Sequence, residues 1–285
     1  MYHPFGSRLP YNPVARMTEH ASLNADCAVI LRTDRESDLQ RITEADVQAV
    51  IFRPEPLPAW LHDLAAAVES GAFVVPRSVL NRATRDELAA WLAALPDVGL
   101  APDVRDALFD DVLALAGRLE TATGASRFLV RIFTAAPTTE CGFHVDTVPR
   151  RAPQWGLLRV YNGEGTGFVE PDNVRSVAEF YRYLGRRERL ERERRTARGE
   201  GDDAACDRLD AEIRALDRSP SFLERSDDIQ VVPAGAIVAF KHIDVGQHWT
   251  SHAKAKAWIH CSPMCGAPRL VVNLTCPEPV RPRPR

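Results

Sequence analysis

The chain has 285 residues, of which 45% are hydrophobic and 26% charged, and its formal net charge is −3 at pH 7. These values are ordinary for a globular protein with a sizeable core, and they give no electrostatic reason to expect nucleic acid or an anionic membrane as a partner. The start of the sequence lacks the features of a secretory signal, and no window holds the ~20 apolar residues that span a bilayer. We therefore expect a cytoplasmic, single-domain protein.

The N-terminal part of the chain is predicted to form a helical layer. Residues 1–25 look irregular because prolines interrupt them. Residues 26–124 open with a short strand at 27–32, and from 43 to 117 the apolar residues recur at helical spacing. We assign residues 26–124 to helices packed on a barrel.

One helix of this layer carries a clear start and stop signal. Thr84 is its expected N-cap, and Glu87, three residues later, completes a capping box. Pro96 is expected to close the helix.

After Gly124 the pattern changes to short strands rich in β-branched and aromatic residues, each bounded by turn residues. Eight such strands are enough to close a small barrel or jelly roll. The sequence therefore predicts an α+β fold whose core, residues 125–276, is a jelly-roll or cupin-like barrel, followed by a tail at 277–285. The eight predicted strands are residues 128–133, 142–146, 157–161, 167–170, 229–232, 236–241, 257–262 and 269–276.

A charged segment, residues 177–225, interrupts the barrel between its fourth and fifth strands. Its middle is mostly Arg and Glu, and opposite charges four residues apart support solvated helices. We predict an inserted helical hairpin with a hinge at 199–203. Two roles stay open: a lid or a contact within a homodimer, and surface decoration.

The run Cys141-Gly-Phe-His-Val-Asp146 carries the most chemistry. On a strand, His144 and Asp146 point to the same face. His260, on the seventh predicted strand, can add a second imidazole. Two histidines and one carboxylate form the facial triad of non-haem iron(II) enzymes, which leaves coordination positions open for an organic chelate and O2. The sequence predicts that these three residues bind iron(II) and are catalytic.

Arg269 opens the eighth predicted strand, beside the strand of His260. A guanidinium in the same cavity suits a dicarboxylate, because it can form two parallel hydrogen bonds with one carboxylate. Asn273 shares a strand face with Arg269 and is expected to hydrogen-bond in the pocket. Arg159 is the second choice for holding the co-substrate.

This arrangement of two histidines, an aspartate and an arginine resembles the iron(II)/2-oxoglutarate dioxygenase superfamily. The resemblance implies a double-stranded β-helix in which 2-oxoglutarate chelates the metal and its far carboxylate meets Arg269. More narrowly, residues 25–276 resemble the bacterial family called domain of unknown function 1826, which brings no activity with it. The chain departs from that family in a longer charged insert and in Cys261, where an arginine is expected. The motifs are Phe143-His-Val-Asp-Thr-Val148, Leu158-Arg-Val-Tyr-Asn-Gly-Glu-Gly-Thr166 and His260-Cys-Ser-Pro263 with Arg269-Leu270.

Four further side chains are candidates for substrate contact, and each has an alternative role in packing or in an internal ion pair. Pocket arginines would favour a small, anionic substrate. The four are Arg131, Trp155, Tyr161 and Trp258.

Other metal sites and functions remain open. His252, in a predicted loop with His248, is a rival third ligand. Cys261 and Cys265, with Cys141 and Cys276, could hold zinc with His260. The alternatives to a 2-oxoglutarate enzyme are a cupin-like metal enzyme that does not use it (an oxygenase, isomerase or hydrolase) and a non-catalytic zinc-binding or sensing protein.

Overall fold

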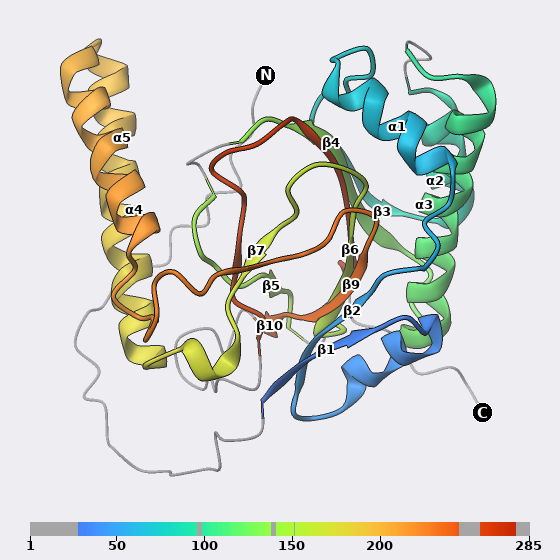
Figure 1. The fold of residues 1–285 in the computed structure, drawn as a ribbon, viewed down its shortest axis with the longest axis horizontal. Coiled ribbons are helices and arrows are strands. Elements are labelled where there is room, and N and C mark those ends of the chain that lie inside the picture. The colour runs from blue at the N-terminus through green and yellow to red at the C-terminus, as the bar shows by residue number, and fades with distance from the viewer. Residues whose placement is uncertain (1–27, 96–98, 138–140, 151, 245–256, 278–285) are drawn as a thin grey trace.

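The computed structural model describes residues 28–95, 99–137, 141–150, 152–244 and 257–277, and shows a mixed α+β fold (Figure 1). A large sheet occupies the centre. Helices α1 to α3 lie on one side of the molecule, and the hairpin of α4 and α5 lies on the other. No helix in the described ranges combines the length and the apolar character needed to cross a membrane.

Seven strands form the large sheet, in the order β1-β2-β9-β6-β12-β4-β3. Neighbouring strands are antiparallel except β1 and β2, which are parallel. The strands are β1 (Val29–Thr33), β2 (Val47–Phe52), β3 (Ser78–Ala83), β4 (Phe128–Ala135), β6 (Trp155–Val160), β9 (Ile237–Lys241) and β12 (Arg269–Thr275).

Two small sheets complete the β-structure. One has three strands, in the order β11-β7-β8, and the other pairs β10 with β5. A single antiparallel bridge also joins His144 to His260, the first residue of β11. The strands are β5 (Thr147–Val148), β7 (Gly167–Phe168), β8 (Gln230–Val231), β10 (Ile243–Asp244) and β11 (His260–Cys261).

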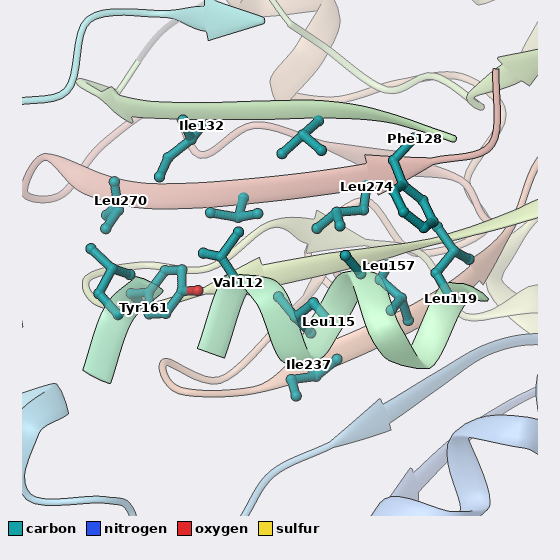
Figure 2. Close-up of a cluster of buried hydrophobic side chains, with 14 of the residues drawn as sticks. Val112, Leu115, Leu119, Phe128, Ile132, Leu157, Tyr161, Ile237, Leu270 and Leu274 are labelled. Carbon is teal, nitrogen blue, oxygen red and sulfur yellow. The ribbon is translucent and has the colours of Figure 1, made fainter. Parts of the chain in front are cut away.

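The helical side of the large sheet is the main core. Helix α3 (Pro102–Thr123) lays Val112, Leu115 and Leu119 against the sheet (Figure 2). Leu270 and Leu274 of β12 point into this core, so Arg269, Val271 and Asn273, between and beside them, point to the other face. This alternation decides which polar residues lie on the face away from α3. The other helices on this side are α1 (Trp60–Glu69), α2 (Arg85–Ala93) and the 3-10 turn η2 (Glu36–Thr43).

The predicted cap of α2 is confirmed. The Thr84 hydroxyl accepts a hydrogen bond from the Glu87 amide, and the Glu87 carboxylate accepts one from the Thr84 amide. Pro96, predicted to end this helix, lies outside the described residues.

The inserted hairpin is confirmed as two helices, α4 (Val177–Glu200) and α5 (Asp203–Arg218). The turn between them uses Gly201 at φ 73°, a conformation that glycine adopts without steric cost. The short 3-10 turn η3 (Pro171–Asn173) precedes the hairpin.

Two elements of the predicted helical layer are strands. Residues 43–117 were expected to be helical, but β2 and β3 lie within them and join the large sheet. All six residues of β2 are buried, so its sequence shows no alternation to mark it as a strand.

The second predicted barrel strand, residues 142–146, is also different, because its pairing is reduced to the bridge at His144. The predicted α+β class is confirmed, with the described strands divided among three sheets.

Candidate metal centre

His144, Asp146 and His260 come together, as the sequence predicted. One ligand atom from each residue lies within 4.8 Å of the others. His144 Nε2 and Asp146 Oδ1 lie 3.6 Å apart. Donor atoms bound to one ion at about 2.0–2.2 Å lie within about 4.4 Å of each other. Small side-chain rotations would therefore bring all three atoms onto one cation.

The backbone sets this convergence. The His144 N–H donates to the His260 carbonyl at 2.8 Å, and the His260 N–H donates to the His144 carbonyl at 3.0 Å. Residues that exchange both hydrogen bonds across an antiparallel pair project their side chains to the same face. The two rings accordingly lie with centroids 4.2 Å apart. The Ile243 N–H, which donates to the Asp146 carbonyl at 2.9 Å, fixes the third ligand.

Both imidazoles are oriented through their Nδ1 atoms. His144 Nδ1 lies 2.8 Å from the carbonyl of Gly142, and His260 Nδ1 lies 3.1 Å from the carbonyl of Trp258. A carbonyl only accepts, so each Nδ1 donates a proton to it, and Nε2 is left as the nitrogen that can bind a metal. Metal-binding histidines are typically held in this way, by a hydrogen bond from the nitrogen that does not bind the metal.

The three ligands also have the electrostatics of a cation site. Burial would raise the pKa of Asp146, but His260 and His144 outweigh it and lower this pKa to about 2. Burial, with the neighbouring His144, lowers the pKa of His260 to about 3. Desolvation opposes the charge on His144, yet Cys141 and Asp146 raise its pKa to about 9. At neutral pH Asp146 is therefore a carboxylate, His260 is neutral and His144 is protonated. A divalent cation that binds the group would replace the proton on His144.

The group is accessible from one side. The side chains of His144 and Asp146 are 31% and 24% exposed, whereas His260 is buried. Trp258 stacks on the His260 ring with centroids 4.6 Å apart and is itself fully buried. Trp258, a candidate substrate contact, therefore lies behind a metal ligand and helps to fix its ring.

His242 is a functional candidate that sequence reasoning did not single out. It is buried, and its Nε2 lies 4.0 Å from Asp146 Oδ2. Burial lowers the pKa of His242 to about 4, so the ring is neutral. It lies over Gly156, where a Cβ atom would come within 2.7 Å of its ring. A glycine inside a strand can mark such a close approach, but the strand predicted at 157–161 began one residue after Gly156, which lies inside β6.

Three of the predicted pocket residues share the face of the large sheet that is turned toward these ligands. Arg131 is close enough to Asp146 to help lower its pKa. Asn273 is the register partner of Arg131 across β4 and β12. Arg269 is buried on the same face and donates to the Thr166 hydroxyl at 3.2 Å.

Three other predicted site residues lie on the opposite face, and their assignment to the site is corrected. Arg159 forms an ion pair with Asp111 of α3, 3.3 Å away, and Tyr161 donates to the same carboxylate at 2.8 Å. Trp155 packs against the core on this helical side. The reason is the alternation of the strand, which turns all three toward α3. Arg159 thus takes the alternative role of an internal ion-pair partner, and Trp155 and Tyr161 take the alternative role of packing.

The cysteines do not gather around the metal ligands as a set. Cys141 Sγ lies 3.6 Å from His144 Nδ1, and Cys261 packs among apolar side chains. Cys265 is exposed beside Glu164, and Cys276 contacts Thr123 at the end of α3. Within the described ranges, the one group placed to hold a metal is the His-Asp-His set. His248 and His252 lie outside those ranges.

The base of the inserted hairpin supports the segment that carries His144. The Phe143 N–H donates to the Tyr183 hydroxyl at 2.9 Å, and that hydroxyl donates to Asp217 at 2.6 Å. Arg187 donates to the same carboxylate at 3.0 Å. A Cβ atom on Gly142 would come within 2.1 Å of Arg187 Nε, so only glycine fits there. The hairpin therefore fixes the backbone on which the first metal ligand stands.

The fold and this group define a mixed α+β protein with a candidate two-histidine, one-carboxylate metal centre. The chain belongs to the family described as protein of unknown function (DUF1826), whose model matches residues 33–274. None of the curated proteins compared with this chain matches its sequence.

Two solved structures are distantly similar to the chain. A rice dioxygenase for auxin oxidation has 14% sequence identity and a TM-score of 0.42, with 88% of this chain and 83% of that chain covered. A Pseudomonas putida prolyl-4-hydroxylase has 13% identity and a TM-score of 0.34, with 84% and 98% covered. Because both likenesses are distant, we base the function on this chain's own residues.

Removing the hydroxyl of Tyr183 should weaken metal binding. In Tyr183→Phe the Phe143 amide and Asp217 each lose a partner, which should cost about 1–3 kcal/mol of stability. The less constrained His144 should bind divalent metal about tenfold more weakly. Tyr161→Phe is the matched control, because it removes a similar hydroxyl-to-carboxylate bond on the other face. Metal titration and urea unfolding measure both quantities. Equal metal affinity in the two variants would contradict a positioning role.

The buried His242 should make the metal-free protein sensitive to mild acid. Its pKa in the folded state is about 4, against an ordinary 6.5, so the unfolded chain takes up the proton first as the pH falls. Stability should fall by about 1.5 kcal/mol from pH 6.5 to about pH 5 through this residue alone. His260 contributes in the same direction.

Urea unfolding with a chelator present, at both pH values, measures this loss. His242→Gln should show about half the wild-type loss, because His260 remains. His62→Gln, on the exposed surface of α1, should behave as wild type. A full wild-type loss in His242→Gln would show that the residue is not held neutral.

Proposed function

We propose that the protein is a non-haem iron(II) oxygenase that uses 2-oxoglutarate and O2 to hydroxylate or otherwise oxidise a small, anionic molecule. The observation that carries the proposal is the pair of imidazoles, each tied to a carbonyl through Nδ1, with one ligand atom of each ring and of Asp146 within 4.8 Å of the others. His144, Asp146 and His260 would hold the metal. When bound, iron(II) in such a set supplies the activation of O2.

The donor set favours iron over a structural zinc ion. Structural zinc sites are closed by four ligands, usually thiolates and imidazoles. Two nitrogens and one oxygen from this chain leave three positions of an octahedral ion for other molecules. The partial exposure of His144 and Asp146 gives those molecules a way in.

Arg269 supports a dicarboxylate co-substrate. Its guanidinium is buried, and burial lowers its pKa to about 10, so it keeps its charge at neutral pH. Among the described residues its hydrogen-bond partner is the neutral Thr166, and no carboxylate pairs with it. A buried cation without a counter-ion is costly. The far carboxylate of 2-oxoglutarate would supply that counter-ion through two parallel hydrogen bonds.

The fold that accompanies this proposal is a double-stranded β-helix, with the large sheet as one wall and the small sheets as the other. One cluster of buried side chains supports it. Phe168 of β7 and Trp258 pack with Phe240 and Val271 of the large sheet. The three-stranded sheet β11-β7-β8 thus lies over the face of the large sheet that carries Arg131 and Asn273.

A second candidate is a non-catalytic zinc-binding protein. The observation in its favour is Cys141, whose Sγ lies 3.9 Å from His144 Nε2 and could supply a thiolate. Metal analysis separates the two candidates, because tight zinc without consumption of 2-oxoglutarate would favour the second.

Anaerobic titration with iron(II) and 2-oxoglutarate tests the proposal. The wild-type protein should bind one iron and show a metal-to-ligand charge-transfer band when 2-oxoglutarate is added. It should then consume 2-oxoglutarate when O2 is admitted. His144→Ala and His260→Ala should lose the band, because each removes one of the three ligands. His62→Ala, a histidine exposed on α1, should keep it. The proposal would be contradicted if the wild-type protein showed no charge-transfer band, or if the band were unchanged in both ligand variants.

A further inference from the structure

A polar corner lies on the face of the large sheet that is turned toward the candidate metal ligands, apart from Arg269. Arg131 of β4 and Asn273 of β12 are direct register partners. Their neighbours Ile132 and Leu274 point into the core under α3, so Arg131 and Asn273 point the other way, side by side. Figure 2 shows Ile132 and Leu274 on the α3 side.

His242 closes this corner. A Cβ atom on Gly156 would come within 2.7 Å of the His242 ring and 3.0 Å of the Thr275 methyl, so the ring lies over β6 beside β12. The charge of Arg131 contributes to the low pKa of both His242 and Asp146. The corner is therefore within electrostatic reach of the metal ligands.

The polar atoms of this corner lack protein partners. Both ring nitrogens of the buried His242 and the buried Oδ1 of Asn273 make no hydrogen bond to any residue that the structure describes. Among the described residues, no carboxylate lies within ion-pair distance of Arg131. Buried polar atoms in folded proteins are nearly always hydrogen-bonded, so several orphans at one place point to a ligand that supplies the missing partners.

The chemistry of the orphaned groups defines that ligand. The Arg131 guanidinium has only donors and binds a carboxylate. The Asn273 oxygen is an acceptor and needs a donor, such as a hydroxyl or an ammonium group. The neutral His242 offers one donor and one acceptor.

We propose that Arg131, Asn273 and His242 bind the substrate, and that the substrate is a small carboxylic acid with a hydroxyl or amino group close to its carboxylate. The inference rests on the proposed function, in which a second molecule must lie beside the metal. Asn273 is four residues from Arg269 along β12, or about 13 Å. The two arginines can thus hold two different carboxylates, one for the substrate and one for the co-substrate.

Three probes of nearly equal size test the proposal on zinc-loaded protein, without turnover. Lactate has both groups, propionate lacks the hydroxyl, and lactamide lacks the charge. Calorimetry should show that wild type binds lactate more tightly than either of the others. Chelation of the metal by a probe is common to wild type and variants, so it drops out when the two are compared.

Each variant should remove one preference. Arg131→Gln should weaken lactate binding about tenfold or more and change lactamide binding little, because only lactate has the charge. Asn273→Ala should reduce the preference for lactate over propionate to the part that chelation of the metal contributes. Arg131→Lys keeps the charge and should retain part of the affinity. Arg127→Gln removes an exposed charge just before β4, the strand that carries Arg131, and should bind as wild type.

Two results would overturn the proposal. One is lactate binding to wild type no tighter than propionate and lactamide. The other is a lactate preference that survives Arg131→Gln but is lost in Arg269→Gln, which would place the carboxylate at the other arginine. Neither depends on iron or O2, so the binding result stands even if the oxygenase proposal fails.

Discussion

The site depends on two backbone hydrogen bonds between His144 and His260. These bonds form outside any long strand, at the edge of a small sheet, yet they bring two imidazoles from distant parts of the chain to a ring separation of 4.2 Å. Asp146 follows from the same geometry, since it is two residues from His144 and is tied to Ile243. Because a carbonyl holds Nδ1 of each ring, the orientation of the ring is fixed and Nε2 is the nitrogen left to bind a metal.

The surrounding layers explain why so short a pairing can be precise enough for a metal. On one side, Trp258 stacks on His260 and ties that ring to the core of the large sheet. On the other, the hydroxyl of Tyr183 in the inserted hairpin accepts a hydrogen bond from the Phe143 amide and donates one to Asp217. Arg187 holds that carboxylate in place. The base of the charged hairpin α4–α5 therefore supports the backbone segment that carries His144. Rigid support of this kind is what keeps ligands within the tolerance that metal binding needs.

Sequence alone predicted the ligands and most of the strands, because both follow from local rules. His144 and Asp146 are recognisable by strand spacing, and the capping box of Thr84 by its four-residue pattern. Burial on both faces hid β2, since a fully buried strand shows no period. The alternation of the strand correctly placed Arg159 and Tyr161 on one face. It could not show which face of the sheet packs against the helices. That choice depends on where α3 packs, which is tertiary information, and so does the position of His242.

The central claim is that one cation joins the two imidazoles and the carboxylate through the atoms left free by the backbone. Anomalous diffraction at the iron edge, from crystals grown anaerobically with iron(II), tests it most directly. The account predicts one anomalous peak bonded to Nε2 of His144, Nε2 of His260 and a carboxylate oxygen of Asp146, with the remaining positions open to small molecules. A peak located elsewhere, or an iron that lacks any of these three ligands, would contradict it.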